Sequence, residues 1–182
     1  VSSSANHYCW LQESGEVSCD MDPTSYGYEY GQFDVPDGLN AVAITVGNFH
    51  SCALGETGEV TCWGAGSGSN NGMPFSVGQS NVPSGLRAKA IVGGMAHTCA
   101  ITTAGAVECW GDGNPLLQWS VVAPIDPGSL LAVSLDSSSG GQDVCAIDQL
   151  GILHCWGPNA SEYSTPRPTR AGFKRTPFGH ER

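Results

Sequence analysis

The sequence predicts an all-β fold, an array of four short-stranded antiparallel units that each contain a hairpin disulfide. Glycine is abundant, with 25 of 182 residues, Ser, Val and Thr are common, and helix formers are scarce. The eight cysteines fall into four pairs with nine residues between the members of each pair, and a glycine follows every midpoint. These observations favour many short strands joined by turns.

Each cysteine pair predicts one β-hairpin, at about residues 7–20, 50–64, 97–111 and 143–157. A three-residue hairpin loop needs a positive φ at its last position, which a glycine supplies. With this loop Cys52 lies directly opposite Cys62, and opposed Cα atoms are about 4.5–5.5 Å apart, a separation that suits a disulfide. We therefore predict four local bridges: Cys9–Cys19, Cys52–Cys62, Cys99–Cys109 and Cys145–Cys155.

The second and third repeats also align without a gap ahead of the hairpin. Gly31-Gln32 corresponds to Gly78-Gln79, and the Val-Pro-x-Gly-Leu segment at 35–39 recurs at 82–86. One repeat is therefore a Gly-Gln and Val-Pro-x-Gly-Leu loop, a strand, and then the disulfide hairpin. Three hairpins close with Cys-Trp-Gly, whereas the first closes with Cys-Asp-Met at 19–21, as terminal repeats often differ.

These residues resemble the repeats of the regulator of chromosome condensation family, in particular the cysteine-bearing variety of secreted bacterial proteins and of the ectodomains of crinkly-type plant receptor kinases. The resemblance extends to about Gly157 and implies a β-propeller, in which small antiparallel sheets, the blades, surround an axis. Periods of 43, 47 and 46 residues between successive first cysteines suit one four-stranded blade each. Family members commonly have seven blades, and this chain has four repeats. The family's nuclear exchange-factor role is not expected for a chain with disulfides and an acidic body.

Three tryptophans follow the second cysteine of their hairpins. Trp63, Trp110 and Trp156 alternate with these cysteines along the strand, so they face the opposite side of the sheet. We expect the rings to fill the space between blades, because all three occupy one repeat position. An aromatic cage for a sugar is the functional alternative.

The histidines allow two interpretations. His7, His50 and His97 each precede the first cysteine of a pair by two residues, which would place one His and two Cys together in three repeats. The spacing is not that of a structural zinc site, and the fourth repeat has Asp143 at this position. We expect no metal and no cofactor, and we interpret the histidines as buried hydrogen-bonding groups that tie a strand to a neighbouring loop.

Charge divides the chain into a body of repeats, residues 1–164, and an extended basic, Pro-rich tail, residues 165–182. The body carries 16 acidic and two basic residues, and the tail carries five basic residues and one acidic residue. Such an acidic body disfavours nucleic-acid binding, which needs clustered Lys and Arg. The predicted partner-binding residues of the tail are Arg167, Arg170, Phe173, Lys174, Arg175 and Phe178.

The first repeat is short at its amino-terminal side. Only eight residues precede Cys9, which we expect to be too few for the strand that precedes the hairpin in other repeats. The tail could pair with this blade or could anchor a partner, and we favour the partner because a basic Pro-rich segment is poorly suited to a central strand.

The cysteines indicate an oxidising compartment, outside the cell or in an organelle lumen such as the endoplasmic reticulum or thylakoid. A chain that starts with Val and lacks an apolar leader is typical of a product from which a targeting peptide was removed, and no transmembrane segment is expected. Asn159 begins an Asn-Ala-Ser sequon and is a candidate glycosylation site.

No catalytic motif is recognisable, because the sequence has no Gly-x-Ser-x-Gly elbow, no His-Glu-x-x-His and no phosphate loop. We expect a non-catalytic protein-binding or scaffold protein, an accessory subunit of a larger extracellular or lumenal assembly with the tail as its anchor. A secreted lectin that binds glycans through loops between blades is the alternative, and an enzyme ranks last. A homodimer that completes a ring is a further candidate assembly.

Overall fold

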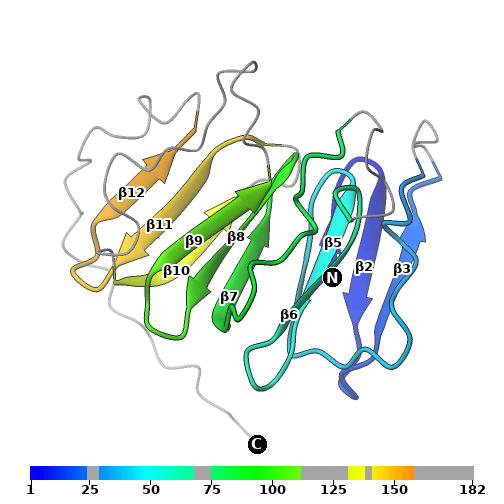
Figure 1. Cartoon of the computed structure of the whole chain (residues 1–182), viewed down its shortest axis with the longest axis horizontal. Helices are drawn as coiled ribbons and strands as arrows, with labels where there is room; N and C mark the ends of the chain where they lie inside the picture. Colours follow the sequence, from blue (N-terminus) through cyan, green and yellow to red (C-terminus); the bar gives the residue numbers. More distant parts are fainter. Residues whose placement is uncertain (24–28, 68–74, 112–130, 138–140, 158–182) are drawn as a thin grey trace, which may run out of the picture.

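The computed structural model describes residues 1–23, 29–67, 75–111, 131–137 and 141–157. The regular structure of these residues is β-strand, which confirms the predicted all-β fold (Figure 1). No helix that could cross a membrane occurs in these ranges. The strands are β1 (Ser2–Ser3), β2 (His7–Leu11), β3 (Val17–Met21), β4 (Ala43–Val46), β5 (His50–Leu54), β6 (Val60–Gly64), β7 (Ala88–Gly93), β8 (His97–Thr102), β9 (Val107–Gly111), β10 (Ala132–Ser137), β11 (Val144–Asp148) and β12 (Leu153–Trp156).

The strands form four antiparallel sheets in chain order, called blades 1 to 4: β1-β2-β3, β4-β5-β6, β7-β8-β9 and β10-β11-β12. Within the described ranges each sheet has three strands, where four-stranded blades were expected. The segment ahead of blade 2 folds as two turns instead, closed by Asp34 N to Gly31 O at 3.1 Å and by Leu39 N to Pro36 O at 3.3 Å. Gly31 and Gly38 take φ values of 75° and 72°, which strands do not use.

The hairpin register agrees with the prediction in all four blades. Cys52 pairs with Cys62 and Leu54 with Val60, and Gly58 ends the three-residue loop with φ at 90°. All four predicted disulfides are present, with Cα atoms 4.0 to 4.1 Å apart. The prediction succeeds because both determinants, the cysteine spacing and the glycine turn, lie within one hairpin.

Blade 1 does have an outer strand, so the expectation that its amino-terminal segment is too short is wrong. β1 pairs with β2 through Ser2 opposite Cys9 and Ser3 opposite Tyr8. Two residues suffice because the hydroxyl of Ser2 also accepts a hydrogen bond at 3.0 Å from the backbone N of Val46, at the end of β4. β1 is therefore held by blade 2 as well as by blade 1.

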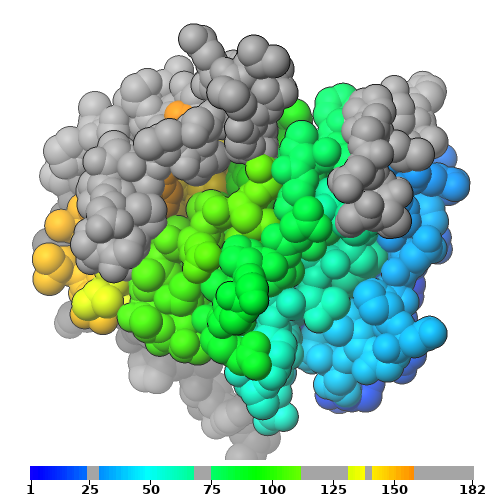
Figure 2. Space-filling model, viewed as in Figure 1, coloured from blue at the N-terminus to red at the C-terminus, as the bar shows by residue number. Residues whose placement is uncertain are grey.

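The blades succeed one another side by side, with blades 1 and 2 at one side of Figure 1 and blade 4 at the other. In Figure 2 the cyan residues of blade 2 and the green residues of blade 3 adjoin continuously. Three hydrophobic clusters account for this, since one lies between each successive pair of blades. The core of the described residues thus comprises three interfaces between sheets and a smaller cluster of Tyr30, Phe49 and Ala65.

Candidate functional site

One packing arrangement recurs at the interfaces between blades. The disulfide of one blade lies against the tryptophan side of the next, so that Cys9 packs in one cluster with Ala53 and Trp63. Cys52 likewise clusters with Trp110, and Cys99 with Trp156. Trp63 and Trp156 are 6% and 2% exposed. Trp63 and Trp156 therefore fill the space between blades as expected and form no surface cage for a sugar, and Trp110, which is partly buried, packs at the corresponding interface.

Buried hydrogen bonds join the same blades. His7 Nε2 lies 2.7 Å from Ser51 Oγ in blade 2, and this hydroxyl donates to the carbonyl of Gln32 at 2.8 Å. His50 Nε2 lies 2.8 Å from Thr98 Oγ1 in blade 3, which donates to the carbonyl of Gln79 at 2.9 Å. Since each hydroxyl proton goes to a carbonyl, the imidazole Nε2–H must donate to the hydroxyl oxygen. The hydrogen-bonding interpretation of these two histidines is confirmed.

The Gly-x-x-His pattern follows from this arrangement. A Cβ added at Gly47 would overlap the ring of His50, and one added at Gly94 would overlap the ring of His97. A side chain at either glycine would displace the imidazole from the interface. The Ser or Thr that follows the histidine completes the motif, and this hydroxyl was absent from the sequence-based prediction.

Burial keeps these histidines neutral. It lowers the pKa of His7 from 6.5 to about 4. The pKa of His50 falls to about 3, chiefly through burial and then through the nearby rings of His97 and His7. Nε2 of each ring contacts a hydroxyl of the next blade, and the cysteine sulfurs are paired in disulfides. No group of three metal-ligating side chains occurs in the part of the chain that the structure describes.

Blade 4 presents the one described disulfide face with large exposed aliphatic side chains. Ile147 and Leu153 oppose each other next to the Cys145–Cys155 bridge and are 39% and 51% exposed. Their counterparts in blade 3, Ile101 and Val107, are 0% and 4% exposed because blade 4 covers them. Blade 4 therefore carries the same aliphatic pair beside its disulfide as blade 3, but no following blade covers it among the described residues.

The outer face of blade 1 is built differently. Tyr8 and Trp10 occupy the repeat positions of Ser51 and Ala53, and their rings stack with centroids 5.9 Å apart. Asp20 stands where blade 2 has Trp63. In the inner blades, small side chains at these positions let the sheet pack closely against the disulfide of the preceding blade. Blade 1 has bulky rings there instead.

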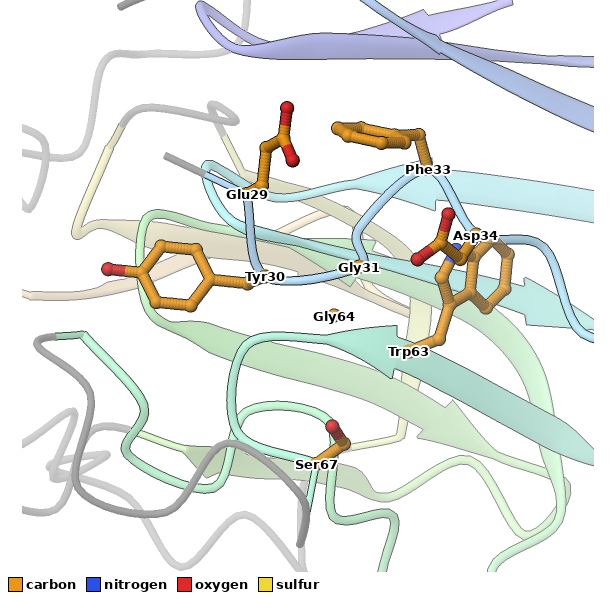
Figure 3. Close-up of a pocket in the computed structure, with 8 residues that line it drawn as sticks. All are labelled: Glu29, Tyr30, Gly31, Phe33, Asp34, Trp63, Gly64 and Ser67. Atoms are coloured by element: carbon orange, nitrogen blue, oxygen red, sulfur yellow. The ribbon is translucent and has the colours of Figure 1, made fainter. Parts of the chain in front are cut away.

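A hollow of about 540 Å³ opens where the 29–34 loop meets the end of β6. Its lining comprises Glu29, Tyr30, Gly31, Phe33, Asp34, Trp63, Gly64 and Ser67 (Figure 3). The loop is held by the amide of Gln32, whose Oε1 accepts from Tyr30 N at 2.6 Å, and the Tyr30 ring packs edge-on against Phe49. The carboxylates of Glu29 and Asp34 are exposed at the rim. The hollow was not predicted from the sequence, because its parts come from segments about 30 residues apart.

The tail residues 165–182 and Asn159 lie outside the described residues. The predicted roles of Arg167, Arg170, Phe173, Lys174, Arg175 and Phe178, and glycosylation of Asn159, therefore stay predictions.

Comparison with known proteins identifies the repeat. A family model described as the regulator of chromosome condensation (RCC1) repeat matches residues 41–72, which hold all of blade 2. The resemblance to RCC1 repeats is confirmed. No curated protein matches the sequence.

Solved structures share the propeller architecture. The CRINKLY WD40 ectodomain of the Arabidopsis thaliana receptor kinase ACR4 superposes with a TM-score of 0.59 at 21% identity, over 86% of this chain and 48% of that one. The ectodomain of the Physcomitrella patens receptor kinase CR4 gives 0.59 at 26% identity, over 87% and 40%. Yeast RCC1 (Prp20), bound to Kap60, gives 0.57 at 17% identity, over 85% and 42%. The chain thus spans less than half the length of these proteins.

Proposed function

We propose that the chain is a non-catalytic protein-binding scaffold, an accessory subunit of a larger extracellular or organelle-lumenal assembly, for example on the lumenal side of a membrane complex. Residues 165–182 act as its anchor. RCC1-type and WD40 propeller neighbours support a protein-binding role, and one of them was solved as a complex of two proteins. The four disulfides support an oxidising compartment.

The observation that carries this proposal is the disulfide face of blade 4. Ile147 and Leu153 repeat the aliphatic pair, Ile101 and Val107, that the interface between blades 3 and 4 buries almost completely. Exposed apolar side chains gathered in this way mark protein interaction surfaces. The partner is a protein surface with small side chains and an aromatic ring, like the Ala53 and Trp63 side of blade 2, because this is what covers the same face elsewhere in the molecule.

A second copy of this chain fits that requirement poorly. Its blade 1 would offer Tyr8 and Trp10 where the covering blade needs small side chains such as Ser51 and Ala53. Nothing in the described residues supports a homodimeric ring, and we propose a different protein as the partner.

Native mass spectrometry of the assembly purified with the full chain tests the proposal. Ile147→Asp with Leu153→Asp should release the partner, because two carboxylates would be buried without counter-charges. Leu150→Asp is the matched control, since Leu150 lies at the hairpin tip of the same blade and is 84% exposed. Retention of the partner by the double variant, or equal loss from the control, would refute the role of this face.

The anchor role of the tail has a separate test. Lys174→Ser with Arg175→Ser in the full chain should lower partner retention and weaken its dependence on salt, because the anchor would lose two cations that pair with acidic groups of the partner. Unchanged partner retention at every salt concentration would refute the anchor role of the tail, while the role of blade 4 would stand.

Glycan binding is the second candidate function, and the stacked rings of Tyr8 and Trp10 favour it. Both side chains are part-exposed, and the exposed carboxylate of Asp20 lies opposite Tyr8 in the register. Aromatic faces beside a hydrogen-bonding group suit a sugar ring. The isolated chain should then bind an immobilised glycan, and Trp10→Ala should abolish this binding. If the wild-type chain binds no glycan, the scaffold role is the remaining candidate.

A further inference from the structure

The hollow beside blade 2 is lined by carboxylates, an aromatic ring and an indole, and the first two of these are absent from the aligned positions of repeat 3. Carboxylates stand at Glu29 and Asp34, where repeat 3 has Ser76 and Asn81. The ring of Phe33 forms part of the lining (Figure 3). The third component is the indole of Trp63 at the base of the hollow.

Trp63 is only 6% exposed, and its buried indole N–H makes no hydrogen bond with the described residues. Figure 3 shows the nitrogen edge of the ring on the side of Gly31 and Asp34, toward the hollow. A buried donor left without an acceptor costs about 1–3 kcal/mol. A ligand that supplies a carbonyl oxygen here would recover that cost.

A basic, Pro-rich peptide meets all three requirements. Its carbonyl groups are free to accept from the indole N–H, because proline lacks a donor and such segments form few internal hydrogen bonds. Its proline rings suit aromatic walls, and its cations suit the two rim carboxylates. A free metal ion would satisfy the carboxylates alone and would leave the indole donor unpaired.

We propose that this hollow binds residues 165–170 of the same chain, Thr-Pro-Arg-Pro-Thr-Arg. Five of the seven basic residues lie in the tail, while the body carries a formal charge of -14 from 16 acidic and two basic residues. A segment on the same chain also has an effective concentration in the millimolar range, so a weak site would be filled.

Connectivity supports the same occupant. The hollow opens where β6 ends at Gly64, and the equivalent residue of blade 4 is Gly157, directly after β12 ends at Trp156. Packed sheets are about 10 Å apart, so two blade steps amount to roughly 20 Å. Arg167 is ten residues beyond Gly157. These can span about 31 Å as a polyproline-type chain.

The inference narrows the proposed anchor, because Arg167 and Arg170 in the proline-rich half of the tail bind the protein itself instead of the partner. Residues 173–178 remain available to the partner. Failure of the docking would leave the partner test at blade 4 and at Lys174 and Arg175 untouched, so the two ideas can fail separately.

Indole N–H signals in ¹H–¹⁵N NMR spectra of the full chain test the proposal. The five tryptophans give five such signals, and Trp63→Phe and Trp110→Phe identify two of them. We expect the Trp63 signal to shift between the wild-type chain and Arg167→Ser with Arg170→Ser. Added salt should move the wild-type signal toward that of the tail variant, because the pairing is electrostatic.

Trp110 is the internal control, since its buried indole N–H also makes no hydrogen bond with the described residues, while repeat 3 has Ser76 and Asn81 at the positions of Glu29 and Asp34. The site variant Glu29→Ser with Asp34→Asn gives blade 2 the residues of repeat 3 and should abolish the effect of the tail substitutions on Trp63. Glu13→Gln with Glu56→Gln changes the net charge equally at exposed hairpin loops and should preserve it.

Three outcomes would overturn the proposal. The Trp63 signal could be the same in the wild-type chain and the tail variant, or Trp110 could respond as strongly as Trp63. A Trp63 signal that moves on dilution of the protein would show that the tail comes from a second copy. Such a result would refute docking within one chain.

Discussion

The inner interfaces and the two terminal faces are built on the same disulfide hairpin but differ in what covers it. Between blades 2 and 3 the Cys52 side chain is fully buried, and a histidine crosses to the hydroxyl of Thr98. On blade 4 the Cys145 side chain is only half-buried, beside the exposed Ile147. The hairpin therefore determines the shape of a blade. Whether its disulfide face is buried and stabilising, or exposed as a surface, depends on the neighbouring blade.

The largest difference in the stability effect of a substitution is expected at the tryptophan position, between blade 2 and blade 1. Trp63→Ala should lower the free energy of unfolding by about 3–5 kcal/mol, because it empties an interface against blade 1. Asp20→Ala at the same position of blade 1 should stay within about 0.5 kcal/mol, because Asp20 is exposed. Urea unfolding with the disulfides intact measures both. Similar losses for the two variants would break the comparison.

Removal of a bridge should come next. Each bridge joins residues 10 positions apart, so loop closure contributes about 2–3 kcal/mol in every blade. Cys52→Ala with Cys62→Ala should cost more than this because it also leaves a gap in the buried interface, whereas Cys145→Ala with Cys155→Ala should cost only the loop term. Non-reducing urea melts of the two double variants compare them, and a larger loss in blade 4 would contradict the account.

Acid should weaken the inner interfaces selectively. The pKa of His50 is about 3 when folded and 6.5 when exposed, so its contribution is complete above pH 6.5 and is lost as the pH falls toward 3. At pH 5 the loss is about 2 kcal/mol for such a group. His50→Gln should therefore flatten the fall in stability between pH 7 and pH 5. His7→Gln should act in the same direction, and an unchanged pH slope in both variants would count against burial of neutral rings.

The hydroxyl link should have the smallest effect. Thr98→Val should cost about 1 kcal/mol, because the ring of His50 and the carbonyl of Gln79 lose their shared partner. Blade 4 already carries Val144 at this position, so the fold accommodates the side chain. Thr61→Val, in a strand of blade 2 away from the histidine link, should stay within about 0.5 kcal/mol. Thermal melts of both variants measure these losses. Equal losses would show that the Thr98 hydroxyl does not stabilise the interface.

Prediction from the sequence was most successful where structure is local. The pairing of Cys52 with Cys62 depends on spacing and on Gly58 within one hairpin, so the register could be predicted. The described residues contain three strands of each expected four-stranded blade, and the period of the repeat does not reveal that Gly31 and Gly38 turn the chain before β4. The hollow could not be predicted, since its two carboxylates gain significance only from the indole of Trp63 in another segment.

Amide hydrogen exchange of the full chain, alone and in its purified assembly, tests the central claim most directly. If the disulfide face of blade 4 is the protein-binding surface, the amides of β11 and β12 should gain protection in the assembly, while those of β2 and β3 stay unchanged. Protection gained on β2 and β3 instead, or on neither terminal blade, would contradict the account.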